Sequence, residues 1–263
     1  MPIWLYNLPP LYSALLTIIF VEAISLLGLF LTRRFLLHRF HYSDGTNDAI
    51  SGTVQAIGVF YGITVGLIAV GVWNTNSNAS DLVSREAASI GALYRDVSGY
   101  PSPLREELRQ NLREYTVFTI DEAWPAQRKG QLLDGGTRLM LGFQDKLYPF
   151  NPSTQGQMAL HQETLRGYNQ LTEYRRLRID AVGSGLSGIM WAVIWVGAGI
   201  SIGVAYLYKI QDGILHGILV ALMGGFLAMV LFMIVINDKP FYGQAALSST
   251  PYQLILDRVI DMK

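Results

Sequence analysis

Four long apolar stretches interrupt an otherwise ordinary distribution of polar residues along this chain. They run from about Leu11 to Thr32, Ala49 to Trp73, Leu186 to Tyr208 and Ile214 to Ile236. A helix needs about 20 mainly apolar residues to cross a hydrocarbon core about 30 Å thick, and each stretch meets that length. The pattern therefore predicts an all-α membrane protein with two transmembrane hairpins, residues 1–73 and 186–236, followed by a juxtamembrane segment, 237–263.

Residues 74–185 carry most of the charge and predict a helical domain outside the bilayer. Val83, Ala87, Ile90, Tyr94 and Val97 recur at helical spacing, so that stripe should be buried. A second helix follows Pro103 and ends at Trp124-Pro125. A third spans about 134–148, and a fourth, capped by Ser153, spans about 155–174 before the third membrane span.

The second membrane span should continue into the polar domain without a break. No Gly or Pro occurs between Val72 and Ile90, and a helix from Asp48 to Val97 would be on the order of 75 Å long. The fourth helix of the domain can likewise continue into the third span, although Gly183 and Gly185 weaken that junction. Such long helices would form a stalk at the membrane surface.

Small residues follow one face of the second span. Gly58, Gly62 and Gly66 recur every four residues and allow another helix to approach closely. The partner helix belongs either to the same subunit or to another copy around an axis. The opposite face carries Phe60, Thr64, Leu67 and Asn74, which could line a narrow conduit with an apolar constriction.

Glu22 is the only formal charge well inside a predicted span. Because a carboxyl group is costly in lipid, Glu22 should face protein, water or a partner, or carry a proton. Gln55 lies at similar depth and is a candidate hydrogen-bond partner. The pair is either a packed polar contact or part of an ion pathway.

The segment after the fourth span concentrates residues with special backbone or interfacial roles. Pro240 must end or kink the helix. Asp238 and Lys239 can pair at the interface, and Phe241 and Tyr242 suit the headgroup level. The segment up to Gly243 is therefore a membrane anchor and a candidate functional turn.

Composition excludes several other functions. Charged residues make up 15% of the chain, the net charge is zero and cysteine is absent. These values give no argument for nucleic acid and rule out disulfides and thiolate metal sites. His38 and His41 are three residues apart, but no carboxylate spacing around them completes a metal site. No phosphate loop, dinucleotide fingerprint or nucleophile elbow occurs, so we expect no enzyme, cofactor or metal.

Orientation in the membrane stays undecided. Three arginines follow the first span and favour an external N-terminus, whereas three arginines before the third span and one lysine after the fourth favour the opposite. These residues are Arg33, Arg34 and Arg39, against Arg175, Arg176, Arg178 and Lys239. The composition and spans fit an integral protein of the bacterial inner membrane.

Several segments together resemble a bacterial family of bestrophin-like membrane proteins of unknown function. The matching residues occur along nearly the whole chain: Arg33-Arg34, Asn47-Asp48, Arg85-Glu86-Ala87-Ala88, Leu93-Tyr94-Arg95, the stretch from Asp121 to Trp124-Pro125, Arg175-Arg176-Leu177-Arg178, and Asp238-Lys239-Pro240-Phe241-Tyr242-Gly243. The resemblance implies a likeness to bestrophins, which are homo-pentameric anion channels with four spans and an intracellular helical domain. The second span lines their pore, which here corresponds to Val59, Phe60, Ile63 and Leu67.

The leading hypothesis is a homo-oligomeric membrane channel or channel-like protein with the second span near the axis. Anions are one class of ion that it could conduct, and five copies are one possible stoichiometry. A non-conducting scaffold or sensor, whose helical domain binds a partner, is the main alternative. A small transporter with Glu22 as its proton carrier is a third, although the sequence contains no evident inverted repeat.

Overall fold

The computed structural model describes residues 6–40, 43 and 45–261. Throughout these residues the secondary structure is helical, with turns and bends between the helices and no strand. The predicted all-α class is therefore confirmed. His41 and the side chain of His38 lie outside what the structure describes, so the expectation for this histidine pair stays a prediction.

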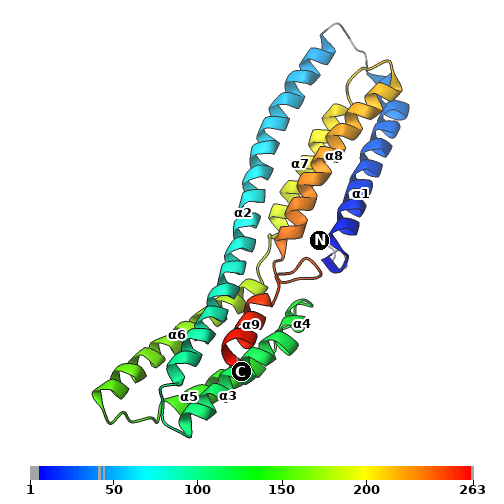
Figure 1. The fold of residues 1–263 in the computed structure, drawn as a ribbon. Helices are drawn as coiled ribbons and strands as arrows, with labels where there is room; N and C mark the ends of the chain where they lie inside the picture. The colour runs from blue at the N-terminus through cyan, green and yellow to red at the C-terminus, as the bar shows by residue number, and fades with distance from the viewer. Residues whose placement is uncertain (1–5, 41–42, 44, 262–263) are drawn as a thin grey trace. The chain divides into compact units, whose positions relative to one another are not determined.

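Four helices are long and apolar enough to cross a membrane (Figure 1): α1 Pro10–Leu31, α2 Thr46–Val97, α7 Gly188–Ala205 and α8 Gly213–Asp238. After α1 the chain continues through a π-helical turn, η2 Thr32–Leu36, and a 3-10 turn, η3 Leu37–Arg39. Three of the predicted spans agree with α1, α7 and α8 to within a few residues, and the second corresponds to the first half of the longer helix α2. The protein is thus a four-span, all-helical membrane protein.

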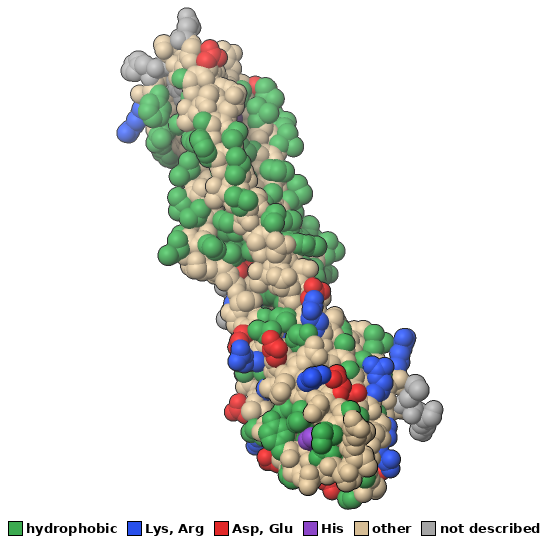
Figure 2. Space-filling model, turned by 90° about the vertical axis from the view of Figure 1, so that its left-hand side faces the viewer, with side chains coloured by type: hydrophobic (Ala, Val, Ile, Leu, Met, Phe, Trp, Pro, Cys, Tyr) green, Lys and Arg blue, Asp and Glu red, His purple; other side chains and the backbone are tan. Residues whose placement is uncertain are grey.

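The chain divides into two compact units. One, here called the membrane unit, contains Met1–Thr75 and Gly185–Asp238. The other, here called the polar unit, contains Asn76–Ser184 and Lys239–Lys263. The two units differ in their surface chemistry (Figure 2). Hydrophobic side chains are spread over the visible surface of the membrane unit, whereas most of the visible Lys, Arg, Asp and Glu side chains lie on the polar unit.

Inside the membrane unit, α1 packs closely on α8. The buried stripe of α1 recurs every fourth residue and is rich in small hydroxyl side chains: Ser13, Thr17, Val21, Ser25 and Leu29. Gly224 of α8 faces this stripe so closely that a Cβ there would lie 3.0 Å from the Ser25 Oγ. Small residues on both helices therefore permit the close approach.

The second span is continuous with the helix that follows it, as predicted. Helix α2 contains 52 residues without interruption. By contrast, α6 (Gln155–Val182) does not continue into α7, so that expectation is wrong. The chain leaves helical structure after Gly183, and Ser187 begins α7 by accepting a hydrogen bond from the Met190 backbone N–H.

The polar unit packs the second half of α2 against shorter helices: α3 Leu104–Phe118, η4 Thr119–Ala123, α4 Trp124–Gln127, α5 Gly135–Leu147, α6, α9 Thr250–Ile255 and η5 Leu256–Ile260. The predicted stripe is buried, with Ile90 and Val97 at 0% exposure. Two details differ from prediction. Thr154, and not Ser153, caps α6. Trp124-Pro125 does not end a helix but forms the first turn of α4, a position that tolerates proline because its backbone N–H would have no partner within the helix.

Candidate functional site

The membrane half of α2 presents a wide apolar face that none of the described residues covers. Val59 and Ile63 are each 59% exposed, Leu67 is 70% exposed and Phe60 is 73% exposed. Thr64 and Asn74 are exposed as well. At about 100° per residue these side chains fall on one broad side of the helix. The candidate pore-lining residues therefore share a face that is free in the single chain.

The opposite side of α2 attaches it to the membrane unit. Val65, Ala69 and Val72 are buried in a core with Ile194 of α7 and Leu231 of α8. The Tyr61 hydroxyl donates to the Ile194 backbone oxygen at 3.0 Å. This attachment fixes which side of α2 stays free.

The glycine stripe belongs to the free surface. Gly58, Gly62 and Gly66 are exposed, and a Cβ built on any of them would meet no atom within 4 Å. No described segment of this chain packs on the stripe, so the structure gives no support to the alternative in which it packs inside the same subunit. The stripe lies between the attached side of α2 and the Phe60 side, where a neighbouring helix could approach.

Hydroxyl groups on the free face bond within their own helix. The Thr64 Oγ donates to the Phe60 backbone oxygen at 2.8 Å, and the Thr75 Oγ donates to the Gly71 backbone oxygen at 3.0 Å. These bonds turn the hydroxyl hydrogens back to the backbone. The face from Val59 to Leu67 is consequently apolar in its chemistry.

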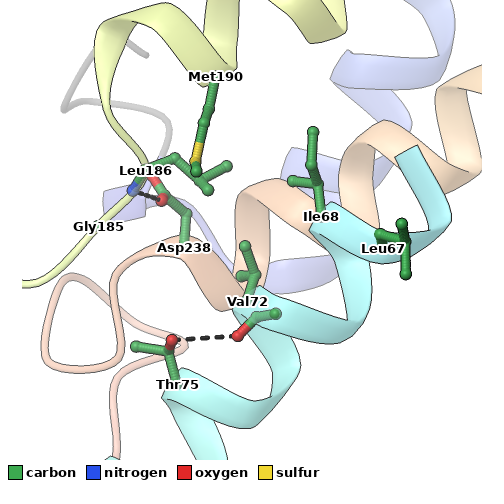
Figure 3. Close-up of a pocket in the computed structure, with 9 residues that line it drawn as sticks. Leu67, Ile68, Val72, Thr75, Gly185, Leu186, Met190 and Asp238 are labelled. Atoms are coloured by element: carbon green, nitrogen blue, oxygen red, sulfur yellow. Dashed lines mark hydrogen bonds between the residues drawn. The ribbon is translucent and has the colours of Figure 1, made fainter. Parts of the chain in front are cut away.

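A pocket of about 430 Å³ lies at the Thr75 end of this membrane half (Figure 3). Its walls are mostly apolar and come from α2, the segment just before α7, the first turn of α7 and the end of α8: Leu67, Ile68, Gly71, Val72, Thr75, Gly185, Leu186, Met190 and Asp238. Asp238 is already occupied, since Oδ1 accepts from the Leu186 backbone N–H at 2.6 Å and Oδ2 from the Tyr6 hydroxyl at 3.1 Å. Asp238 therefore ties the end of α8 to the beginning of α7.

The expected Glu22–Gln55 pair is not formed. Gln55 donates to the Ser51 Oγ one turn away on α2 at 3.3 Å. Glu22 instead lies against the glycine pair of α8, where a Cβ on Gly225 would be 2.8 Å from Glu22 Oε1. Its Oε2 is buried without a hydrogen-bond partner among the described residues. Glu22 thus lies against α8, one of the surroundings that the sequence left open, and not against Gln55.

In the polar unit, three motif segments converge on one buried ion pair. Glu86 of α2 is 0% exposed and accepts from the Arg178 Nε and Nη2 of α6. The Tyr115 hydroxyl of α3 donates to Glu86 as well, and Arg178 Nη1 donates to Gln127 Oε1 at 2.9 Å. The Trp124 ring lies 5.7 Å from the guanidinium. The family-motif residues Glu86, Trp124 and Arg178 therefore form one cluster.

Electrostatics favour the charged form of the Arg178 guanidinium. Burial alone lowers the pKa of the Arg178 guanidinium, but the Glu86 carboxylate outweighs burial and holds that pKa well above its usual value. Burial, reinforced by Glu86, also raises the pKa of Tyr115. Tyr115 therefore remains a neutral donor to the carboxylate. A fully hydrogen-bonded buried pair of this kind favours one arrangement of the helices.

The closing motif folds into the polar unit and not into a membrane anchor. Phe241 is 2% exposed and packs edge-on against Trp124, with ring centroids 5.7 Å apart. Pro240 accepts from the Leu247 backbone N–H at 2.8 Å, and Gly243 has a φ of 71° that favours glycine. Lys239 donates to the Ser184 backbone oxygen at 3.5 Å, so the predicted Asp238–Lys239 pair is absent.

The remaining motif residues lie at helix ends and in contacts with the C-terminal segment. Tyr94 donates to the Ile260 backbone oxygen at 3.2 Å, and its ring lies 4.5 Å from the Arg109 guanidinium. Arg95 and Arg176 are exposed, and Asp48 is in the first turn of α2, where its charge suits the helix dipole. Pro125 occupies the first turn of α4.

Asn47 and Arg33 hold the connection between α7 and α8. Asn47 accepts from the Lys209 backbone N–H at 3.0 Å and donates to the Lys209 backbone oxygen at 3.1 Å. Arg33 donates to the Ile210 backbone oxygen at 3.2 Å. Arg34 instead lies beside the Phe35 ring, 5.7 Å from its centroid. Two motif residues, Asn47 at the start of α2 and Arg33 just after α1, therefore hydrogen-bond to the same α7–α8 connection.

Sequence reasoning missed Tyr115, Gln127 and Tyr252 as members of the ion-pair cluster. The Tyr252 ring lies 5.9 Å from the Arg178 guanidinium and is completely buried. Tyr115 shares the buried side of α3 with Leu108 and Leu112, and no local pattern separates such a tyrosine from an ordinary core residue. Among the described residues, no group of three or more His, Cys, Asp or Glu could hold a metal ion.

Comparison with known proteins agrees with this architecture. The chain matches the bestrophin-like domain over residues 19–252. A variant of a bacterial bestrophin homologue from Klebsiella pneumoniae has a TM-score of 0.69 at 9% identity, covering 95% of this chain and 100% of that chain. A second variant of that homologue has a TM-score of 0.63 at 11% identity, covering 93% and 98%. No curated protein sequence matches significantly.

Four apolar helices and a helical polar unit define an integral membrane protein with the bestrophin fold. The domain match extends over most of the chain, and the protein belongs to the bestrophin-like family.

Proposed function

We propose that the protein is a homo-oligomeric channel of the bacterial inner membrane, in which α2 of each copy lies nearest the axis. The open glycine stripe carries this proposal. Gly58, Gly62 and Gly66 offer a surface for close helix approach, and no segment within residues 6–40 and 45–261 occupies it. Copies around an axis would cover the stripe and turn the neighbouring Phe60 face inward, with five copies as the first stoichiometry to test.

Lipid alone is a poorer partner for this face than another α2 helix. The exposed side of α1 is built from large side chains such as Ile19, Phe20 and Leu27, which suit acyl chains. The exposed side of α2 mixes glycine with Phe60 and Leu67. Small residues let helices pack closely but give lipid little contact area. An apolar ring of Phe60 would form a narrow constriction that controls wetting.

Ion flux from liposomes tests the proposal directly. Liposomes that contain the full-length protein should release chloride, or sodium if the pore is selective for cations. Phe60→Ala should raise the flux several-fold because it widens the apolar constriction. Phe20→Ala is the matched control, since Phe20 is 58% exposed on α1 and should leave flux unchanged.

A silent wild type together with silent Phe60→Ala would contradict conduction and favour the scaffold or sensor. Native mass measurement in mild detergent separates the two further. The channel requires several copies in one assembly, whereas a monomer would contradict the placement of α2 at an axis.

Proton-coupled transport is the second candidate function, because Glu22 Oε2 is buried in the membrane unit without a partner among the described residues. A transporter of this kind should lose coupled uptake in Glu22→Gln. The channel should keep its flux in the same variant, so one substitution distinguishes the two functions.

A further inference from the structure

A second pocket, of about 380 Å³, lies in the membrane unit beside the connection between α7 and α8. Arg33, Leu37 and Phe40 line it from the segment after α1, and Tyr208–Gln211 line it from the connection. Figure 1 shows this connection beside the end of α1. The pocket therefore combines cationic, aromatic and aliphatic side chains where two apolar spans end.

The Arg33 guanidinium is held in a fixed position. Nη1 donates to the Ile210 backbone oxygen at 3.2 Å and lies 3.2 Å from His216 Nδ1. His216 is 1% exposed, and its Nε2 lies 3.1 Å from the Ala205 backbone oxygen. Because a carbonyl oxygen can only accept, Nε2 carries the hydrogen and Nδ1 accepts from Arg33. The α7–α8 connection and helix α8 thus orient one side of the guanidinium.

The other side of this guanidinium is open. Arg33 Nε has no hydrogen-bond partner among the described residues, and Nη2 makes only a long contact of 3.5 Å to the Gln211 backbone oxygen. The same Nε and Nη2 edge is filled in two other arginines. Arg113 uses it to bind both oxygens of Asp261, and Arg178 uses it to bind Glu86.

No carboxylate of the described residues forms an ion pair with Arg33. The nearest acidic residue in sequence on the connection, Asp212, turns its Oδ1 to the backbone N–H groups of Ile214 and Leu215. Lys209 adds a second cation to the lining. The pocket therefore presents a preorganised planar fork that matches the geometry of an oxyanion such as phosphate.

Apolar side chains surround this fork. They are Leu37, Phe40 and Ile210, and Phe40 is 51% exposed. A free anion would use only the fork, whereas an anion attached to acyl chains would use the fork and the apolar surface together. Basic pockets at the ends of spanning helices bind lipid headgroups in this way.

We propose that this pocket binds the phosphate of an anionic lipid headgroup through the Nε and Nη2 edge of Arg33. The proposal concerns a site on each copy and does not depend on whether the protein conducts ions. A phosphate in the fork would also brace the α7–α8 connection, because Arg33 already holds Ile210.

Lipid retention by the full-length protein tests the site. We expect native mass spectra in mild detergent to show more bound phosphatidylglycerol than phosphatidylcholine after incubation with equal amounts of each. Arg33→Gln should reduce this preference about five- to tenfold, the size expected for one charged fork at a headgroup. Arg34→Gln is the charge-matched control and should retain the preference, since Arg34 does not line the pocket.

Equal retention of the two lipids by the wild type would overturn the proposal, and so would an equal loss in Arg34→Gln. If Arg33→Gln does not fold, Arg33→Lys replaces it as the test, because lysine keeps the charge and removes the planar fork. An unchanged preference for phosphatidylglycerol in Arg33→Lys would overturn the proposal. Sodium phosphate is compared with sodium chloride at matched ionic strength without lipid. Thermal stabilisation by phosphate, combined with no lipid preference, would identify a free anion and overturn the lipid source.

Discussion

The two halves of α2 have the same secondary structure and opposite surroundings. In the polar unit, Val83, Ile90 and Val97 are at most 2% exposed, and even the charge of Glu86 is buried with partners. In the membrane unit, Phe60 and Leu67 are at least 70% exposed, and Gly62 faces open space. Other helices of the same chain bury one side of α2 in the polar unit, whereas the Phe60 face in the membrane unit stays uncovered by the described residues.

This difference separates what stabilises the single chain from what builds an assembly. Polar groups buried in the second half of α2 must be paired inside the chain, because an unpaired buried charge is costly in any folded state. Apolar and small residues on the first half carry no such requirement, since lipid or another copy can cover them. Substitutions in the two halves should therefore have different consequences.

The largest effect is expected from breaking the ion pair in the polar unit. Arg178→Met leaves the Glu86 carboxylate buried without its cation and should lower the free energy of unfolding by about 3–5 kcal/mol. Thermal unfolding in detergent measures the change. Arg176→Met, on the exposed side of the same helix, should stay within about 0.5 kcal/mol of wild type. Equal melting of the two variants would refute the structural role of the pair.

In the membrane unit, Gly62→Leu should leave the single chain folded and weaken the assembly. No atom of the described residues lies within 4 Å of a Cβ at this position, so melting of the protomer should not fall. A helix that packs on the stripe would be overpacked by about 1–3 kcal/mol per interface, which lowers association about tenfold or more. The oligomer fraction is read by native mass measurement.

Gly199→Leu provides the control for the glycine stripe, because Gly199 of α7 also faces open space. We expect its oligomer fraction to match the wild type. If Gly62→Leu and Gly199→Leu assemble equally well, α2 is not at the interface between copies.

The smallest effect concerns Asp96, near the end of α2 in the polar unit. Burial raises the pKa of this carboxyl, and the charge of Glu163 adds to the rise. Because the folded state binds the proton more tightly than the unfolded state, ionisation of Asp96 lowers stability as the pH rises through the folded pKa. Asp96→Asn should therefore melt slightly higher than wild type at pH 7. The advantage should vanish below the ordinary carboxyl pKa, as thermal melts at several pH values can check.

Much of the fold follows from local pattern. Four uncharged stretches long enough to cross a bilayer specify the spans, and the absence of Gly and Pro after Val72 specifies the continuous α2. Helical spacing from Val83 to Val97 specifies a buried stripe. These features depend on residues close together in sequence, and the free energy of placing them in lipid or in a core hardly depends on which distant segment they meet.

Tertiary structure decided the partners. The sequence offered Gln55 for Glu22 and Lys239 for Asp238, but Glu22 lies against Gly225, and Asp238 binds Tyr6 and the Leu186 backbone. The sequence also contained Glu86 and Arg178, 92 residues apart, without indicating that they meet. It could not tell whether the Gly62 face was filled. A residue pattern specifies the face of a helix, whereas its partner depends on how distant helices pack, because pairing energies belong to contacts that only the folded chain brings together.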